Sequence, residues 1–578
     1  MNTDVVAGRD AGVDVEAILQ RLSLREKVGQ VVAAGFPGLD IPPEFTRLLQ
    51  EGNLGGVILF SRNIQDPEQT AALTNALQRR ALESSSGLPL LISTDQEGGV
   101  VSRLWHGATR FPGNMALGAV RDPQLAHAVG RAMGEELRAV GINFDLAPVL
   151  DVNNNPANPV IGVRSFGEDP QVVAQLGAAL AQGLQEAGVA ACGKHFPGHG
   201  DTAVDSHLDL PVIPHSRQRL DAVELVPFRA AIAAGIWSIM TAHVIFPAVE
   251  HEQRPATISA AVLQGLLRQE LGFQGLIVTD CLEMNAIARS VGTAQGAVEA
   301  IRAGADQVLI SHTLALQEEA LHALLAAVDS GALPLQRLDD AVRHVLALKA
   351  RLGLLAAPAK ALVEEKDVGR RVGAPEHQAV AQEVARRSMT WLKPPQSGTL
   401  LPLQPQWVSA YLVVEVEPAA RSMAEDKPRE PGSLAEELQA RLPGLVWARV
   451  PASQVEAETP RLLKQAAGKA VVVLATYNAD RSPAQVALAR ALRRQGAQVV
   501  VVAQRSPYDL AALPEVEACL AAYSYQPVSL AAAAEVLLGD LPAPGHPPVQ
   551  VIGPTPGSRE DRLGRPETPS GPARGAWV

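Results

Sequence analysis

Short apolar runs alternate with helical patterns from Leu24 to Leu355. Between the runs, apolar residues recur every three or four positions, as in PEQTAALTNALQRRALE (67–83). Nearly continuous apolar strands separated by helices predict a parallel sheet covered on both faces. Over about 330 residues, this pattern favours a (β/α)8 barrel over an open doubly wound sheet. The apolar runs are GGVILF (55–60), PLLIST (89–94), INFDLAPVL (142–150), WSIMTAHVIF (237–246), GLIVTD (275–280) and ADQVLIS (305–311).

A second series of apolar runs and helical stretches follows a polar connector. We therefore expect a barrel domain over residues 1–355, a linker over 356–375 and a smaller α/β sandwich domain over 376–552. Residues 553–578 are rich in Pro, Gly, Ser, Arg and Glu, a composition that predicts a disordered tail. The runs assigned to the second sheet are WVSAYLVVEVE (407–417), KAVVVLATYN (469–478) and AQVVVVAQRS (497–506).

Composition narrows the class of protein. The 578 residues are 47% hydrophobic and 19% charged, which fits globular domains with sizeable cores. Lys and Arg number 50 against 61 Asp and Glu, a net charge of −11. This acidic balance argues against nucleic acid or an anionic membrane as partner, since both need a basic surface. The chain contains neither GxGxxG after an early strand nor GxxxxGK[ST], which disfavours nucleotide binding.

The expected compartment is the cytoplasm. Cys192, Cys281 and Cys519 are far apart, form no metal-spaced set and suggest no disulfide framework. The first residues carry acidic groups and no apolar signal-peptide core, and no run of 18 apolar residues occurs. The sequence makes no prediction of an oligomeric state.

Polar residues follow several predicted strands, where a parallel barrel carries its reactive groups. Asp95, Asp151, His243 and Asp280 occupy such positions. We consider Asp280 a candidate nucleophile, because a carboxylate at a strand end can attack a sugar's anomeric carbon and hold a covalent intermediate. Asp is also a favoured helix N-cap, and a helix-like segment follows, so position alone leaves both interpretations open.

Residues 194–207, KHFPGHGDTAVDSH, concentrate three histidines, two aspartates and a lysine. His207, with Asp205 two residues earlier, is a candidate acid/base pair. Imidazole titrates near neutrality and a neighbouring carboxylate would orient it. The alternative is an exposed Asp and His on a loop. Gly198 and Gly200 are expected to ease rearrangement of that loop.

Further polar groups are candidates for holding a ligand. Lys194 and His195 follow an apolar strand and could donate hydrogen bonds to sugar hydroxyls; a buried, satisfied histidine with a lysine beside it is the alternative. Arg103 and Arg164 stand within DQEGGVVSR and GVRSFGEDP, although a lone arginine is more often a surface charge. A metal site built from the loop histidines is disfavoured because the chain lacks HExxH.

These motifs together resemble glycoside hydrolase family 3, in its bacterial β-N-acetylhexosaminidase branch. The likeness covers the predicted barrel and continues weakly into the second domain, in ATYNADRSPAQ (475–485). The motifs that carry it are DQEGG (95–99), RSFGEDP (164–170), KHFPGHGDTAVDSH (194–207), MTAHV (240–244), PATIS (255–259) and GLIVTDCLEM (275–284).

The resemblance implies a (β/α)8 barrel and retaining hydrolysis of terminal β-N-acetylglucosamine, without metal or organic cofactor. Asp280 would be the nucleophile, and His207 the proton donor and acceptor, partnered by Asp205 on a mobile loop. A second group would hold the sugar hydroxyls. This group comprises Asp95, Arg103, Arg164, Lys194 and His195.

The expected partner is a small carbohydrate, either a GlcNAc-containing glycoside or a muropeptide of peptidoglycan turnover. Three other activities stay open: a phosphorylase acting on the same glycosides, a β-glucosidase of the same family, and a metal-dependent hydrolase. A carbohydrate-binding protein without catalysis is a further alternative, which the joint presence of Asp280, Asp205 and His207 disfavours.

Overall fold

The computed structural model describes residues 13–202, 210–357 and 361–551. The predicted parallel barrel is confirmed: eight strands close in the order β1 to β8, with every adjacent pair parallel. The strands are β1 (Val32–Ala34), β2 (Gly56–Ile58), β3 (Leu91–Thr94), β4 (Phe144–Asp145), β5 (Ala190–Phe196), β6 (Ser238–Thr241), β7 (Leu276–Cys281) and β8 (Gln307–Ile310).

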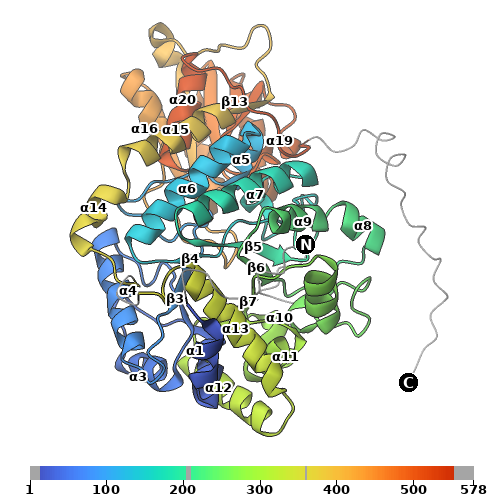
Figure 1. Ribbon diagram of the computed structural model, residues 1–578. Helices are drawn as coiled ribbons and strands as arrows, with labels where there is room; N and C mark the ends of the chain where they lie inside the picture. The colour runs from blue at the N-terminus through green and yellow to red at the C-terminus, as the bar shows by residue number, and fades with distance from the viewer. Residues whose placement is uncertain (1–12, 203–209, 358–360, 552–578) are drawn as a thin grey trace, which may run out of the picture.

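Helices surround the barrel in the order expected of a βα repeat (Figure 1). Three of them begin at an Asp–Pro pair, in which the Asp side chain accepts a backbone N–H of the first turn and Pro takes the first helical position. The helices are α1 (Val15–Arg21), α2 (Leu24–Gln30), α3 (Pro43–Gly52), α4 (Pro67–Leu82), α5 (Asn114–Val120), α6 (Pro123–Ala139), α7 (Pro170–Glu186), α8 (Arg217–Ala222), α9 (Leu225–Ala233), the π-helix η5 (Ala261–Glu270), α10 (Asn285–Ala288), α11 (Thr293–Ala303), α12 (Leu314–Asp329) and α13 (Leu335–Arg351).

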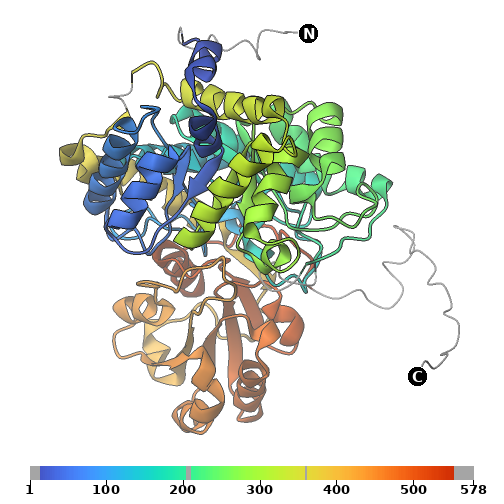
Figure 2. The same ribbon diagram turned by 90° about the horizontal axis from the view of Figure 1, so that it is seen from below.

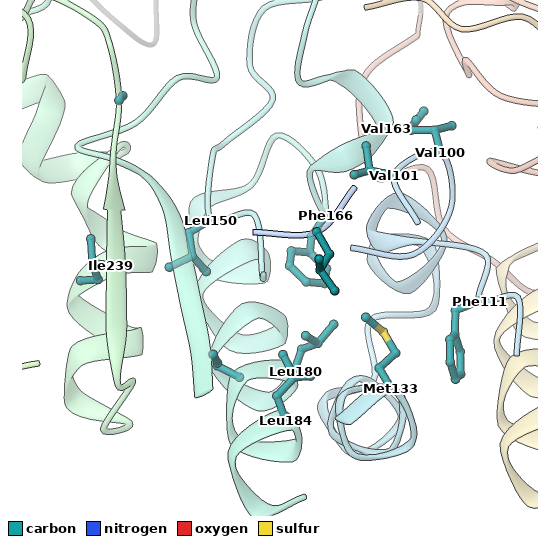
Figure 3. Packing of buried hydrophobic residues seen from close by; sticks show 14 of the residues in the cluster. Val100, Val101, Phe111, Met133, Leu150, Val163, Phe166, Leu180, Leu184 and Ile239 are labelled. Atoms are coloured by element: carbon teal, nitrogen blue, oxygen red, sulfur yellow. The ribbon is translucent and has the colours of Figure 1, made fainter. Parts of the chain in front are cut away.

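The barrel has one core inside its strands and another between strands and helices. Phe144, Cys192 and Met240 fill the interior with neighbours from the other strands. In the outer layer, Figure 3 shows Met133 of α6 and Leu180 of α7 pointing toward Phe166. Since successive strand residues face opposite sides, both layers need apolar residues, and this explains the nearly continuous apolar runs.

One predicted strand is much shorter than its apolar run. The run 142–150 pairs as β4 only at Phe144 and Asp145, plus an isolated bridge from Val149 to Lys194. Pro148 interrupts the run and lacks the N–H that a continuous ladder requires. The carboxyl end of this segment therefore forms an irregular wall of the barrel mouth.

The second part is the predicted α/β sandwich, built on a six-stranded sheet in the order β11-β10-β12-β13-β14-β9. All neighbours are parallel except β14 and β9. Its strands are β9 (Thr390–Lys393), β10 (Tyr411–Glu417), β11 (Val446–Pro451), β12 (Val471–Thr476), β13 (Gln498–Ala503) and β14 (Ala518–Ala521); its helices are α15 (Pro375–Ser388), α16 (Leu434–Arg441), α17 (Val455–Ala466), α18 (Pro483–Arg494), α19 (Asp509–Ala512) and α20 (Pro527–Leu538). The short helix α14 (Val368–Arg371) precedes them and contacts α4 and α6 of the barrel.

Residues of β10 alternate between the two faces of this sheet. Tyr411 and Val413 join the core beneath α15, α16 and α20, whereas Leu412 and Val414 join the core beneath α17 and α18. The sheet is thus covered on both sides. The chain division at residues 355 and 375 stays a prediction, and the predicted tail lies outside the described residues. In the described part of the chain, no helix is long and apolar enough to cross a membrane.

The two parts pack directly against one another (Figure 2). Helix α15 contacts α5 and α6 of the barrel. On α15, His377 lies 3.0 Å from a carboxylate oxygen of Glu136 and 3.0 Å from one of Glu135. Glu136 also accepts the backbone N–H of Gly373, at 3.0 Å. These contacts tie the start of the second part to α6.

We predict that His377 makes a pH-dependent contribution to stability. Hydrogen bonds and charge from Glu136 and Glu135 raise the pKa of His377. The contribution should be complete below the unfolded pKa of about 6.5 and be lost as pH rises through the higher folded pKa. His377→Gln should lower the melting temperature more at pH 6 than at pH 9. An equal loss at both pH values would contradict the prediction.

Candidate active site

A cavity of about 320 Å³ opens at the carboxyl ends of the barrel strands. The structure places six of the predicted site residues around it, although they come from separate strands and loops. Asp205 and His207 lie outside the described residues. The six lining residues are Asp95, Arg103, Arg164, Lys194, His195 and Asp280.

Four charged side chains form the floor of this cavity: Glu97, Arg164 and Lys194 are buried, and Asp95 is partly exposed. The Nζ of Lys194 lies 2.7 Å from Oδ1 of Asp95 and 2.7 Å from Oε1 of Glu97. Arg164 donates to the same Glu97 from two nitrogens, Nε at 2.9 Å and Nη2 at 2.8 Å. The loop after β3, the turn at residues 162–164 and strand β5 are thereby held together by charge-assisted hydrogen bonds.

The charges in this network stabilise each other's ionised states. Burial opposes ionisation of Glu97, but Arg164 and Lys194 outweigh it and lower its pKa to about 2. Burial likewise opposes ionisation of Asp95, yet Lys194 and Arg103 hold its pKa below the ordinary value. Desolvation disfavours the charged form of Lys194, and the two carboxylates reverse this and raise its pKa. The floor stays fully ionised near neutral pH.

Asp280 lies in β7, at the edge of the cavity, and is half-buried. One carboxylate oxygen, Oδ1, accepts the backbone N–H of Cys281 at 2.7 Å. The next helix, α10, begins only at Asn285 and its N-cap position is Met284. The alternative that Asp280 caps a following helix is therefore wrong, and this carboxylate belongs to a strand end that faces the cavity.

Asp151 holds two histidines that also line the cavity, His195 and His199. Its Oδ2 lies 2.7 Å from Nδ1 of His195, so that ring nitrogen donates to the carboxylate. Its Oδ1 accepts backbone N–H groups of His195 at 3.2 Å and His199 at 2.6 Å. Burial, together with neighbouring His195, lowers the pKa of His199 to about 4, so its ring is neutral near pH 7.

The glycines of the histidine-rich stretch serve close packing. A Cβ on Gly200 would lie 1.8 Å from the carbonyl oxygen of Val152, and one on Gly198, at φ +143°, would lie 3.1 Å from Glu224. The first distance is far below van der Waals contact. Gly200 is thus required by the approach of two backbones, and the expectation that it eases rearrangement stays a prediction.

The second part of the chain supplies a wall of the cavity, through residues 423–426. Asp426 accepts from Nη1 of Arg103 at 2.5 Å, and the carbonyl of Ala424 accepts from Nη2 at 3.0 Å. Glu425 in turn pairs with the fully buried Arg505. Arg103 is therefore fixed from both parts of the protein, because Asp95 lies 3.4 Å away on the barrel side.

Sequence reasoning did not assign a role to Glu97, Asp151 or Asp426, and it considered His199 only as a ligand of the disfavoured metal site. Glu97 stood inside the quoted DQEGG motif, and Asp151 was already noted at a strand end, so both had a usable signal. Asp426 had no such signal, since it is 323 positions from Arg103 and comes after a strand of the other sheet.

Two groups of side chains in the described parts could hold a metal ion, each with ligand atoms within 4.8 Å of one another. One, at the cavity rim, comprises Cys281, Glu283 and His312; the other comprises Asp201, His215 and Glu224. In the first, both oxygens of Glu283 already accept backbone N–H groups, from residues 312 and 313. In the second, Asp201 pairs with His215 at 2.7 Å.

The chain is similar to known proteins along most of its length. Residues 23–348 match the family described as the glycosyl hydrolase family 3 N terminal domain. The chain is 33% identical over 561 residues to beta-hexosaminidase A of Pseudoalteromonas piscicida. This match covers 88% of the chain and 91% of that protein. It is 31% identical over 572 residues to the beta-N-acetylglucosaminidase/beta-glucosidase of Cellulomonas fimi, and this match covers 93% of the chain and 95% of that protein.

A solved structure is similar over both parts. The glycoside hydrolase family 3 beta-N-acetylglucosaminidase from Paenibacillus sp. str. FPU-7 has a TM-score of 0.84 and 43% sequence identity. The match covers 92% of this chain and 99% of that one. The likeness therefore includes the sheet that supplies the second wall of the cavity.

Glu97→Gln should destabilise the barrel by about 3 to 5 kcal/mol, because Arg164 and Lys194 would stay buried without their shared counter-charge. Urea denaturation followed by tryptophan fluorescence measures the change. The control is Glu383→Gln, which removes an exposed partner of Arg387 and should cost less than about 1 kcal/mol. Equal stability of the two variants would contradict the assigned role of Glu97.

Proposed function

The chain belongs to glycosyl hydrolase family 3 and is a glycosidase, and from this premise we propose that it removes terminal β-linked N-acetylglucosamine with Asp280 as nucleophile. The observation that supports this most strongly is the position of Asp280, at a strand end and around the same cavity as the charged floor. The similar structure from Paenibacillus is named for this activity.

In the first step, the Asp280 carboxylate attacks the anomeric carbon while the bond to the leaving oxygen breaks. A proton from the His207 imidazolium passes to that oxygen, and the sugar stays bonded to Asp280 as a glycosyl ester. Asp205 would orient His207 and favour its charged form. The roles of His207 and Asp205 rest on the sequence, since both lie outside the described residues.

In the second step, neutral His207 removes a proton from water, whose oxygen attacks the same anomeric carbon. The ester bond to Asp280 breaks and the carboxylate is regenerated. Two inversions leave the released sugar in its original β configuration. A carboxylate nucleophile and an imidazole acid/base thus suffice for the whole cycle.

Five of the residues that line the cavity would hold the sugar hydroxyls. Asp95 can accept hydrogen bonds from them, and Arg103, Arg164, Lys194 and His195 can donate. Ion pairs and hydrogen bonds, with one another and with Glu97 and Asp151, orient these side chains before a sugar enters, so little reorganisation accompanies binding. A cavity of about 320 Å³ is at the small end of the range for ligand sites, which suits one terminal sugar residue.

The proposal extends to substrate source and compartment, namely peptidoglycan fragments in the cytoplasm. β-Glucosides are a second candidate substrate, because the relative from Cellulomonas fimi is named for both activities. Phosphate in place of water in the second step would give a sugar 1-phosphate and make the protein a phosphorylase. The comparison of aryl glycosides with and without phosphate, described below, separates the β-glucosidase and phosphorylase alternatives from hydrolysis of N-acetyl-β-glucosaminides.

Asp280→Ala should lower kcat on an aryl N-acetyl-β-glucosaminide by about a thousandfold or more, because the covalent step is lost. Added azide should restore turnover by occupying the space of the missing carboxylate, and should give the α-glycosyl azide. NMR spectroscopy of the initial product identifies its anomeric configuration. Wild type should release the β sugar, and an α sugar would contradict the mechanism.

Substrate choice is tested with wild type on matched aryl glycosides. kcat/KM should be higher for the N-acetyl-β-glucosaminide than for the β-glucoside, and adding phosphate should leave free sugar as the main product. Preference for the plain glucoside would favour the second candidate. Sugar 1-phosphate as main product would replace hydrolysis by phosphorolysis.

Asp426→Ala should raise KM about tenfold, because Arg103 loses a charge-assisted hydrogen bond that holds it at the cavity. kcat should change less, since Asp426 lies outside the proposed covalent chemistry. Glu430→Gln is the control: this exposed residue follows in the same segment and pairs with Arg110, away from the cavity lining. Unchanged KM in Asp426→Ala would contradict a role of the second part in sugar binding.

A further inference from the structure

Two of the motifs found in the sequence, residues 240–244 and 255–259, have no part in the mechanism proposed above. The structure brings them together at His243, which follows β6 and is only 1% exposed. Its Nδ1 lies 2.7 Å from Oγ1 of Thr257, the central residue of the second motif. The pair is buried beside the strand that carries Asp280.

The other ring nitrogen of His243 contacts the residue directly after Asp280. Its Nε2 lies 2.9 Å from the carbonyl oxygen of Cys281. A carbonyl oxygen only accepts hydrogen bonds, so Nε2 carries the proton and donates. Thr257 also lies within hydrogen-bond distance of Thr241, at 2.8 Å, and of the Ala242 carbonyl, at 3.1 Å. The imidazole is therefore held at both nitrogens.

This contact occurs where the regular pairing of β7 ends. The ladder between β6 and β7 runs from Ser238 opposite Leu276 to Thr241 opposite Thr279, and stops one residue before Asp280. The register between β7 and β8 shifts in the same place, between Val278 and Cys281. At the position of Asp280, backbone pairing alone does not determine the course of the strand.

Cys281 is nevertheless anchored around Asp280. Its carbonyl accepts from His243, its N–H donates to Oδ1 of Asp280 at 2.7 Å, and the next N–H, of Leu282, donates to Leu309 at 2.9 Å. The His243 side chain thus links the segment after β6 to the end of β7, beyond the last backbone pair of Thr241 with Thr279. It does so beside the carboxylate that must be aligned with the anomeric carbon.

We propose that His243 is a positioning residue, which fixes the Cys281 backbone and through it the orientation of the Asp280 carboxylate. The inference rests on the proposed role of Asp280 as nucleophile. His243 does not line the sugar cavity, so it acts on the attack and leaves sugar binding unchanged. When a nucleophile is slightly out of line with the carbon it attacks, the rate of attack falls far more than the affinity for the substrate.

The test compares kcat and KM of three variants on the aryl N-acetyl-β-glucosaminide. His243→Leu removes the donor and should lower kcat about 10- to 100-fold, with KM within about twofold of wild type. His243→Gln can present an N–H at a similar reach and should recover most of kcat. Thr257→Val removes the partner of Nδ1, together with the contacts to Thr241 and Ala242, but leaves the donor Nε2 of His243 in place. It should lower kcat by less, which tests the proposal even if His243→Leu does not fold.

Ser238→Ala is the matched control. Ser238 donates from the same strand, β6, to a carbonyl of β7, Leu276, at 2.9 Å, but at the opposite end of the strand pair. Losing this bond should leave kcat and KM unchanged, although it too removes a buried hydrogen bond between β6 and β7. Melting temperatures of all variants separate a change in stability from a change in rate.

The outcomes distinguish the two proposals. If His243→Leu and Thr257→Val keep wild-type kcat while Asp280→Ala is inactive, His243 is not a positioning residue and the nucleophile assignment stands. If Asp280→Ala keeps wild-type activity, both proposals are wrong. Equal losses of kcat in His243→Leu and His243→Gln, or in Ser238→Ala, would also overturn the inference, because the effect would then not depend on a donor at Cys281.

Discussion

The site depends on one buried carboxylate with two cationic partners. Glu97 accepts from both Arg164 and Lys194, and all three side chains are removed from water. Separating any of them would leave a charge in the interior, which is strongly unfavourable. Three segments that are distant in sequence must therefore meet at one point. Asp95 and Arg103 are added around this point, so the groups proposed to hold the sugar are in place before it arrives.

The second sheet completes this arrangement. Residues 423–426 leave the end of β10 and reach the barrel mouth, where Asp426 pairs with Arg103. Behind them, the buried pair of Arg505 and Glu425 fixes the segment on its own sheet. Docking of the two parts through α15 and the formation of the cavity are thus physically linked. The barrel by itself supplies only part of the wall.

The proposed chemistry is located where regular structure ends. Asp280 follows the last paired residue of β7 on the β6 side, which lets its side chain face the cavity. The same irregularity removes the ladder bonds that would hold it. His243 and Thr257 provide a substitute through side chains, and Asp151 does the same for His195 and His199. The groups proposed for catalysis and binding are thus supported by buried polar partners from neighbouring segments.

The amino-acid sequence by itself determined the barrel, the second α/β sheet and six of the residues that line the cavity. Apolar periodicity specifies parallel strands, and polar residues that end such strands, like Lys194 and Asp280, must converge at one mouth. Tertiary structure alone decided which groups pair there. Whether Asp280 caps a helix or faces a cavity depends on where the strand stops. The meeting of Asp426 with Arg103 depends on docking of two domains, and no local pattern records a contact between residues so far apart in the chain.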